Sequence, residues 1–326
     1  MQGQIDQRLL NDFQRDFPLC STPYLAIASL LDSAEHSVLE QLTQLTQEGK
    51  ISRIGPVFAP RRVGASTLAA MSVPPEQLTD VANLVSRFSA VNHNYARTHR
   101  YNLWFVVTAN SEEALSNTLS EIELAAALPL LNLPLEEAFH IDLGFCLSGK
   151  KPKHQTTQAP LPRDLSLLSP LTETDRHLIA ALQNGLPLTN KPFEALAAIA
   201  KLTEQKVLMR IQTWLADGTI KRFGVIVHHH ELGYRANAML VHDIPDHQIS
   251  EIGRALADEP SVTLCYQRPR RLPDWQHNLF CMIHGRCQDE VQATIKDIRQ
   301  RHGLTHCHHE VLFSTTRYKQ NGARYV

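Results

Sequence analysis

Hydrophobic positions recur with a helical period in the first part of the chain. In the segment that precedes Gly49, the side chains of Val38, Leu42 and Leu45 lie three or four positions apart, and the glycine is a typical stop signal. This pattern predicts three short helices and a β-ribbon, at residues 6–17, 23–31, 33–48 and 51–58. Three helices followed by a ribbon indicate a winged helix-turn-helix.

The pattern changes after the ribbon, where alternating hydrophobic and polar residues predict strands. The predicted order is strand, helix, strand, strand, helix, strand, at residues 67–73, 76–88, 91–98, 101–108, 111–124 and 137–143. This order is typical of a ferredoxin-like βαββαβ sandwich.

The same arrangement occurs twice. Residues 7–64 align without a gap with residues 176–233 at a fixed offset of 169, so that Arg53, for example, matches Arg222. The second copy predicts elements at residues 172–183, 192–200, 203–217, 220–227, 236–243, 246–258, 261–267, 278–284, 288–301 and 305–313. The fold class is therefore α+β, with two tandem copies of a winged helix-turn-helix followed by a ferredoxin-like sandwich. Such a chain is an internal pseudo-dimer.

The repeat sets the expected domain boundaries. They are residues 1–62 and 171–230 for the two winged helix-turn-helix domains, 63–147 and 231–326 for the two sandwiches, and 148–170 for a linker. The linker is rich in Lys, Pro, Gln and Thr and has no periodicity. Its length allows the two halves to dock on each other.

Composition narrows the class of function. The chain has 32 basic and 33 acidic residues, whereas a protein that follows a phosphate backbone usually carries a basic excess. Its six cysteines include no C-x-x-C pair, which argues against a zinc ribbon or an iron–sulfur cluster. Because the N-terminal segment is polar we expect no signal peptide, and no apolar run reaches the ~18 residues of a membrane span. We therefore expect a cytoplasmic protein with no membrane contact.

A winged helix joined to a ferredoxin-like domain is also the layout of the Lrp/AsnC transcription regulators, which residues 40–57 resemble. The third predicted helix argues against DNA as a partner, because it carries Glu35, Glu40 and Glu48 and has no Lys or Arg before Lys50. A helix that reads a groove needs cations for the phosphates and Arg, Asn or Gln for the base edges. We therefore expect the architecture to serve another function.

The densest group of chemistry-bearing residues lies in the second predicted sandwich. Three arginines, Arg268, Arg270 and Arg271, share a hairpin loop with an aromatic ring, Trp275, and a histidine, His277. Guanidinium groups in a loop stiffened by prolines suit a large planar polyanion. The alternative is a solvated hairpin whose charges serve solubility.

The first copy keeps the frame of this loop. Both copies contain Tyr-x-Arg followed by Asn-Leu-aromatic, with Tyr95 and Arg97 in the first copy and Tyr266 and Arg268 in the second. Residues two apart lie on the same face of a strand, so each copy places a phenol beside a cation. In the first copy His99 lies close to the pair.

Two further segments complete the set. The run from His228 to His230 follows the second ribbon, and the basic C-terminal tail contains Arg317, Lys319 and Arg324. The histidine run is either part of a site or a hydrogen-bonded hinge. A tail of this kind is usually either disordered or clamped on an anion.

These segments together resemble the sirohaem (siroheme) decarboxylases of the Lrp/AsnC-like superfamily, in the fused form associated with heme d1 synthesis. The resemblance covers nearly the whole chain and is carried by FGVIVHHHELGYRANAM (223–239), TLCYQRPRRLPDWQHNLFCMIHG (263–285), VLFSTTRYKQNGARY (311–325), RIGPVF (53–58) and NLWF (102–105). It implies a redox-neutral carboxy-lyase that removes two acetate carboxyl groups from siroheme to give 12,18-didecarboxysiroheme. It implies no cofactor, because the iron belongs to the substrate.

The resemblance also implies roles for the residues above. We expect catalytic roles for His229, His230, Tyr266 and Arg268. Contacts with the substrate are expected from Arg270, Arg271, Trp275, His277, Arg317, Lys319, Arg324, Tyr95, Arg97 and His99. One neutral imidazole is expected as the axial ligand of the substrate iron, from His230, His229 or His277.

The expected reaction needs an acid, because loss of carbon dioxide leaves electron density that must be protonated. We expect one competent site, in the second sandwich, since the first copy lacks the histidine run and the Arg-Pro-Arg-Arg loop. Further expected partners are a second copy of the chain and other enzymes of the heme d1 pathway. The alternatives are a regulator that responds to a heme-type ligand and a non-catalytic tetrapyrrole carrier.

Overall fold

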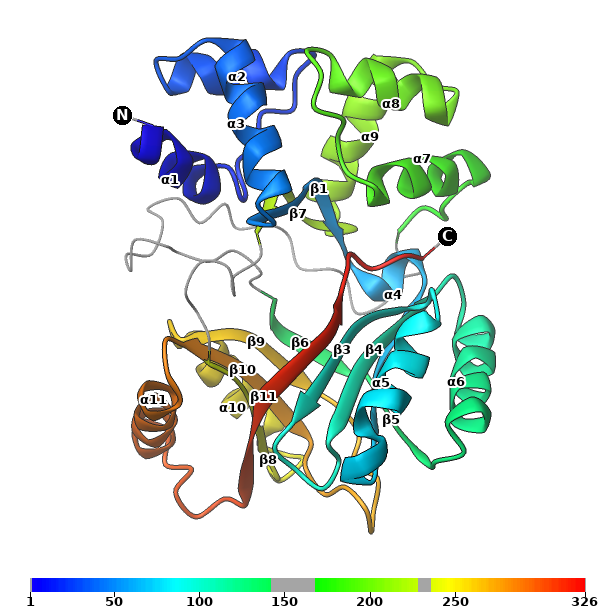
Figure 1. Cartoon of the computed structure of the whole chain (residues 1–326), viewed down its shortest axis with the longest axis vertical. Helices are drawn as coiled ribbons and strands as arrows, with labels where there is room; N and C mark the ends of the chain where they lie inside the picture. Colours follow the sequence, from blue (N-terminus) through cyan, green and yellow to red (C-terminus); the bar gives the residue numbers. More distant parts are fainter. Residues whose placement is uncertain (1, 142–167, 228–235, 326) are drawn as a thin grey trace. The chain divides into compact units, whose positions relative to one another are not determined.

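The computed structural model describes residues 2–141, 168–227 and 236–325 of the chain. The chain divides into two compact units, whose segments Figure 1 colours along the sequence. The helical unit comprises Met1–Ala65, Gly144–Leu232 and Arg324–Val326, and the sheet unit comprises Ser66–Leu143 and Gly233–Ala323. Each unit therefore combines segments of both sequence copies.

In the helical unit, each copy contributes a helix-turn-helix and one ribbon strand. The elements are α1 (Gln2–Asp12), α2 (Pro23–Leu30), α3 (Glu35–Gln47), β1 (Ile51–Phe58) and α4 (Pro60–Val63) from the first copy, and α7 (Glu173–Gln183), α8 (Pro192–Ala200), α9 (Glu204–Ala216) and β7 (Ile220–Val227) from the second. Pro23 and Pro192 occupy the first turns of α2 and α8, where a missing N–H costs nothing. Thr172 and Asp175 form a capping box at the start of α7.

The ribbon is shared between the copies. β1 pairs antiparallel with β7, and Gly55 lies opposite Gly224, its equivalent in the repeat. Gly224 has no room for a side chain, because a Cβ there would lie 2.4 Å from the carbonyl oxygen of Phe13. The sequence predicts a ribbon in each copy, and the structure instead builds one ribbon with a strand from each.

The third helix of each copy, α3 or α9, accepts a hydrogen bond from the other copy at its N-terminus. Asn190 Nδ2 donates to Glu35 Oε2 over 2.6 Å, and Ser21 Oγ donates to Glu204 Oε2 over 3.0 Å. Ser21 is equivalent to Asn190 in the repeat, and Glu35 to Glu204, so the contact is reciprocal. The first residue of α3 and of α9 is therefore engaged by the other copy.

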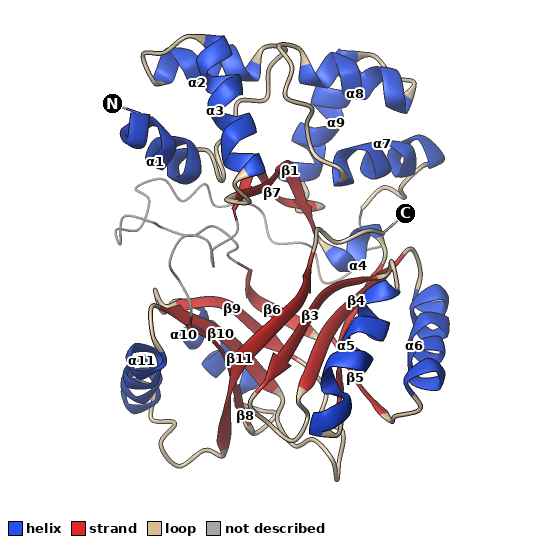
Figure 2. Cartoon of the chain, viewed as in Figure 1, coloured by secondary structure: helices blue, strands red, loops and turns tan. Residues whose placement is uncertain are grey.

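The sheet unit contains one nine-stranded sheet, drawn in red in Figure 2. Its order is β5-β2-β4-β3-β11-β8-β10-β9-β6. The strands are β2 (Ala65–Met71), β3 (Val91–Arg97), β4 (Leu103–Ala109), β5 (Leu130–Pro134), β6 (Glu137–Ile141), β8 (Ala236–His242), β9 (Val262–Gln267), β10 (Leu279–Gly285) and β11 (His309–Gln320). The helices are η1 (Pro75–Gln77), α5 (Leu78–Arg87), α6 (Glu112–Ala126), α10 (Ile249–Ala257) and α11 (Gln288–Arg301). Helix α5 packs on β3 of its own copy and α11 on β8 and β10, whereas α10 packs both on β9 of its own copy and on β6 of the first.

The two copies exchange their last strands. The first half of β11 pairs with β8 of its own copy, and the second half, from Ser314 onward, pairs with β3 of the first copy. In return β6 of the first copy pairs with β9 of the second. The C-terminal tail is thus a sheet strand as far as Gln320, so it is not disordered over this stretch, and anion binding by its cations stays a prediction.

One strand assignment from the sequence is wrong. The pattern predicts residues 137–143 as the last strand of the first sandwich, but β5 takes that place beside β2, while β6 belongs to the sheet of the second copy. β5 ends in Pro134, which cannot donate to a further strand and therefore suits the edge of the sheet. Because β5 is short and ends in a proline, its sequence does not show the alternation that predicts a strand.

Phe139 anchors the exchanged strand β6 on the second copy. Its ring lies against α10 at Gly253, where a Cβ would lie 2.3 Å from the ring. A second hydrophobic cluster joins the copies directly and contains Ala70, Trp104, Leu131, Leu133, Met239, Val241, Trp275, Phe280 and Leu312. The two sandwiches therefore share a core in addition to sharing a sheet.

No helix in the part of the chain that the structure describes is long and apolar enough to cross a membrane.

Candidate active site

The two Tyr-x-Arg motifs lie at equivalent places in the sheet unit, on β3 and β9. In each motif the arginine stacks on its tyrosine, with 5.8 Å between the guanidinium carbon of Arg97 and the Tyr95 ring centre and 5.3 Å for Arg268 and Tyr266. The period of two along a strand explains why the two side chains meet. The structure therefore brings together each predicted pair.

Each of these arginines reaches into the last strand of the other copy's sandwich. Arg97 donates to the carbonyl oxygen of Leu312 over 3.0 Å, and Arg268 donates to that of Leu133 over 2.6 Å. Burial lowers the pKa of both guanidinium groups to about 10, and both Nε atoms are buried without a hydrogen-bond partner among the residues that the structure describes. Both arginines therefore connect the copies and hold the phenols in place.

The tyrosine hydroxyls are available for chemistry. Neither Tyr95 nor Tyr266 donates or accepts a hydrogen bond through its hydroxyl within the described residues. Burial raises the pKa of each phenol to about 12, and the neighbouring arginine opposes that rise in part. Both phenols are therefore protonated at neutral pH and can act as proton donors.

The asparagine shared by both motifs has a structural role. Asn102 accepts the N–H of Val73 over 2.9 Å and donates to the carbonyl oxygen of Val73 over 2.8 Å. Asn278 makes the same pair with Ile244, over 2.9 and 2.8 Å. The repeated Asn therefore fixes the start of β4 and β10 against the segment that follows β2 and β8.

The three arginines of the hairpin loop differ in their surroundings. Arg270 donates to Asp243 over 2.6 Å, and it also contacts the Asp246 carboxylate at 2.5 Å. Arg271 is exposed, and its side chain donates through Nε–H to the carbonyl oxygen of Asn132 over 2.8 Å. Two protein carboxylates thus already occupy the Arg270 guanidinium, whereas the terminal nitrogens of Arg271 make no hydrogen bond in the described part of the chain.

Trp275 is part of the core that joins the copies. Its side chain is 2% exposed, and its ring lies 5.2 Å from the Trp104 ring and 5.9 Å from the Phe280 ring. The expectation that Trp275 contacts the substrate is therefore not supported by its position, because its ring is covered by protein.

His277 belongs to a group of histidines from both copies. Its Nε2 lies 3.1 Å from Nδ1 of His308, and Glu310 lies close to both. His99 of the first copy lies 2.6 Å from Glu310 through its Nε2. Burial lowers the pKa of His277 to about 4, so the imidazole is neutral at pH 7.

The position of His277 does not support the role of axial ligand. The side chain is only 3% exposed, and its Nε2 points at His308. A tetrapyrrole iron needs an imidazole nitrogen that projects into an open space large enough for the macrocycle. His229 and His230, the other candidates, lie outside the described residues.

The basic residues of the tail also differ. Lys319 donates to the carbonyl oxygens of Ser86 and Phe88, over 2.8 and 2.9 Å, at the C-terminal end of α5. Arg317 is exposed and pairs with Tyr95 in the register of β11 and β3. Arg324 is exposed and belongs to the helical unit. Arg317 is therefore the tail cation that lies beside a Tyr-x-Arg pair, and Lys319 acts on the helix.

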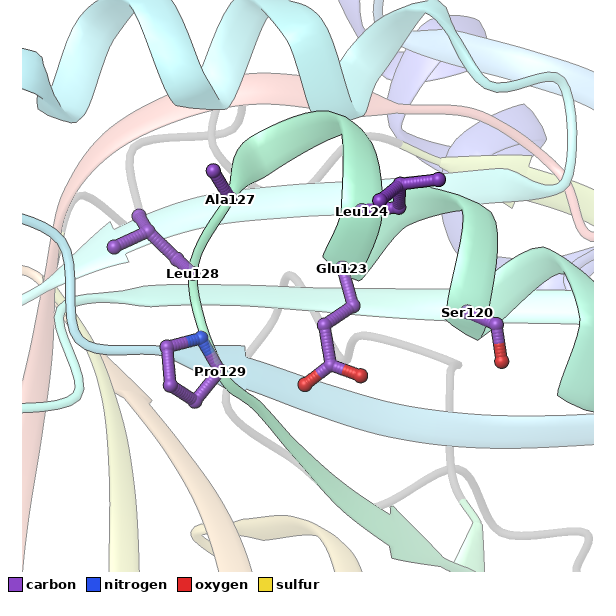
Figure 3. Close-up of a pocket in the computed structure, with 6 residues that line it drawn as sticks. All are labelled: Ser120, Glu123, Leu124, Ala127, Leu128 and Pro129. Atoms are coloured by element: carbon purple, nitrogen blue, oxygen red, sulfur yellow. The ribbon is translucent and has the colours of Figure 1, made fainter.

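A surface hollow elsewhere on the sheet unit offers no chemistry of this kind. Figure 3 shows its lining at the end of α6: Ser120, Glu123, Leu124, Ala127, Leu128 and Pro129. Glu123 is its one ionisable residue, and its carboxylate accepts the N–H of Leu130 over 2.8 Å. The hollow is therefore not a candidate site for a polyanion.

Two kinds of domain match known families. Residues 62–140 and 231–319 match the AsnC-like ligand binding domain, and residues 6–51 and 175–220 match the siroheme decarboxylase NirDL-like HTH domain. The siroheme decarboxylase NirDL subunit of Paracoccus denitrificans (strain Pd 1222) is 42% identical over 320 residues, which cover 98% of this chain and 96% of that protein. The chain belongs to the NirDL family of siroheme decarboxylases.

Two solved structures of NirDL siroheme decarboxylases are similar over the whole chain. A crystal structure of siroheme decarboxylase NirDL has a TM-score of 0.71 at 26% identity, covering 98% of this chain and 94% of that one. A second, in co-complex with an iron-uroporphyrin III analogue, has a TM-score of 0.70 at 25% identity, covering 100% and 94%. These matches confirm the predicted fold class and family, with two helix-turn-helix and two ligand-binding domains in one fused chain.

The site residues predicted from the sequence of this NirDL-type chain do not include His308 and Glu310. They lie two positions apart at the start of β11, so their side chains share a face. A His-x-Glu pattern at a strand start was the available signal. Their approach to His277 follows from the pairing of β8 with β10 and with β11 inside the second copy, and only the contact with His99 joins the two copies.

Proposed function

We propose that this chain is a siroheme decarboxylase of the heme d1 pathway, which converts siroheme into 12,18-didecarboxysiroheme. The match to NirDL proteins over almost the whole chain supports the substrate and the reaction class. The observation that carries the chemistry is the protonated phenol of Tyr266, free of hydrogen bonds within the described residues and stacked against the Arg268 guanidinium.

The reaction breaks the bond between the methylene carbon of an acetate side chain and its carboxyl carbon. Carbon dioxide leaves, and the bonding electron pair stays on the methylene carbon and is delocalised into the macrocycle. One proton then converts that carbon into a methyl group. No electron is gained or lost overall, so each of the two decarboxylations needs an acid and no oxidant.

Tyr266 is the proposed proton donor. A carbon that has just lost carbon dioxide is far more basic than a phenolate, so a phenol with a pKa near 12 can still protonate it. Arg268 is a positioning residue: its charge favours the phenolate that forms, and its hydrogen bond to Leu133 fixes its place. Water then returns a proton to the tyrosine. His229 and His230 stay predicted catalytic residues.

Substrate carboxylates that are retained need cations that the protein has not already paired. Arg271 fits this role best in the hairpin loop, because its terminal nitrogens are unengaged within the described residues. Arg317 of the tail lies beside Tyr95 in the register of β11 and β3, and its contact with the substrate stays a prediction. Contacts from Tyr95, Arg97, His99 and Arg324 stay predictions. Arg270 and Lys319 are reassigned to structural roles, since protein acceptors hold them.

The direct test is anaerobic incubation of the purified chain with siroheme, followed by mass spectrometry of the extracted tetrapyrrole. We expect the mass to fall by two molecules of carbon dioxide. A tetrapyrrole that binds and is recovered unchanged would instead support the non-catalytic carrier. Association into a homo-oligomer and contact with other heme d1 enzymes stay predictions that this experiment does not address.

The geometry weakens the alternative of a DNA-binding regulator. A recognition helix reads base edges with the residues at its N-terminus. In this chain the first residues of α3 and α9 are carboxylates, and each is hydrogen-bonded to the other copy. We expect a gel-shift assay with DNA from upstream of the gene for this chain to show no protein–DNA complex, with or without siroheme. A sequence-specific complex would favour the regulator.

A further inference from the structure

Three side chains of the sheet unit converge with the donor atoms that a metal ion requires. They are His277, just before β10, and His308 and Glu310, at the start of β11. One ligand atom from each lies within 4.8 Å of the others. His277 is buried, Glu310 is partly buried and His308 is exposed, so the group opens to solvent on one side.

The spacing of these atoms suits a tetrahedral ion. Two imidazole nitrogens bound to zinc at about 2.0–2.1 Å stand about 3.3 Å apart. His277 Nε2 and His308 Nδ1 are 3.1 Å apart. Two nitrogens at this distance need either one shared proton or a cation between them, and a small widening admits the cation.

The third proposed ligand, Glu310, contacts a further histidine, His99. Oε2 of Glu310 is buried and has no well-formed hydrogen bond within the described residues, although His99 Nε2 lies 2.6 Å away. The backbone N–H of Tyr101 donates to His99 Nδ1 over 2.9 Å, which leaves Nε2 as the ring nitrogen that carries a proton on the side of the carboxylate. A histidine that orients a ligating carboxylate is typical of the outer shell of a metal site.

We propose that His277, His308 and Glu310 bind a divalent transition-metal ion, for which zinc is the best match, and that His99 orients Glu310. Two imidazoles and one carboxylate leave a fourth position of the tetrahedron for water. This ion is separate from the iron of any tetrapyrrole, because His277 is covered by protein. Since His99 comes from the first copy and the three ligands from the second, the ion would strengthen the junction between the copies.

The test measures zinc binding in the absence of any tetrapyrrole. The parent protein is the full chain with His228, His229 and His230 replaced by Gln, so that this run cannot contribute. After removal of metal with a chelator, zinc is titrated in competition with a chromophoric chelator, and cobalt is titrated by its visible spectrum. We expect one equivalent of metal per chain and a four-coordinate cobalt spectrum without a thiolate band.

Matched variants decide the assignment. His308→Ala removes an exposed ligand and Glu310→Gln keeps the shape of the third, and each is expected to weaken zinc binding at least tenfold. His306→Ala, an exposed histidine two positions from His308, is expected to bind as the parent does. Far-ultraviolet circular dichroism verifies the fold of each variant. Absence of binding at micromolar zinc in the parent, or unchanged binding in both ligand variants, would overturn the proposal.

Discussion

At the scale of single residues, the two tyrosines of the Tyr-x-Arg motifs have similar environments, but we expect only Tyr266 to contribute strongly to the reaction rate. Burial raises the pKa of both phenols to about 12, and each stacks on an arginine, Arg97 being buried and Arg268 partly buried. The sequence assigns the competent site to the second copy, and the geometry of Tyr95 and Tyr266 does not by itself distinguish them. Substitution of each phenol separates these possibilities.

Tyr266→Phe removes the proposed acid and keeps the ring. Because a positioned acid contributes about 100- to 10,000-fold, the single-turnover rate with siroheme is expected to fall at least about 100-fold with little change in affinity. The matched variant, Tyr95→Phe, is expected to change the rate by less than about threefold. Equal losses in the two variants would show that both copies are competent.

Replacing Arg270 is expected to reduce stability, whereas replacing its neighbour Arg271 is expected to reduce siroheme affinity. Arg270→Ala leaves Asp243 without its charged partner and is expected to lower the free energy of unfolding by about 1.5–3 kcal/mol, with siroheme affinity almost unchanged. Arg271→Ala is expected to weaken siroheme binding at least tenfold without loss of stability. Denaturant unfolding and spectroscopic titration measure the two effects, and an exchange of the outcomes would refute the reassignment of Arg270.

His242 couples stability to pH. Its ring is fully buried, neither nitrogen has a hydrogen bond within the described residues, and burial lowers its pKa to about 3. The unfolded chain takes up a proton near pH 6.5 and the folded chain does not, so stability is lost as the pH falls from about 6.5 toward 3, by about 1.4 kcal/mol per unit. His242→Leu is expected to remove this part of the acid sensitivity in denaturant unfolding at pH 7 and pH 5. An unchanged pH dependence would show that His242 does not contribute.

At the scale of elements, the exchange of β6 and β11 is the feature that builds the site. At the same junction the carbonyl oxygens of Leu133 in β5 and Leu312 in β11 accept hydrogen bonds from Arg268 and Arg97, and Glu310 lies beside His99. The helices and most strands follow from periodicity, because local patterns determine them. The exchange of strands cannot be predicted in this way, because β6 would show the same alternation of hydrophobic and polar residues in either sandwich.

Gly253 tests how the exchanged strand is held. In Gly253→Ala the new methyl group would overlap the Phe139 ring, and overpacking of this kind costs about 1–3 kcal/mol in the free energy of unfolding. Adding Phe139→Leu is expected to recover part of the loss, which a double-mutant cycle measures. Strictly additive losses would mean that the ring does not press on Gly253.

At the scale of the whole molecule, duplication and fusion account for most of what could be predicted from the sequence. The offset of 169 residues reveals the pseudo-dimer, and the repeated Tyr-x-Arg motif reveals residues that meet at equivalent sites. The partners of those arginines could not be predicted, because they are backbone carbonyls of the opposite copy. The hydrogen bonds of Arg270 with Asp243 and Asp246 could not be predicted either, because more than 20 residues separate the arginine from each aspartate in the sequence.

The central claim is a redox-neutral decarboxylation completed by a proton. Its most direct test is anaerobic turnover of siroheme in heavy water, followed by mass spectrometry and NMR of the product. The account predicts loss of two molecules of carbon dioxide and one solvent deuterium in each of two new methyl groups. A product without deuterium in those groups, or one that has lost electrons as well as carbon dioxide, would contradict it.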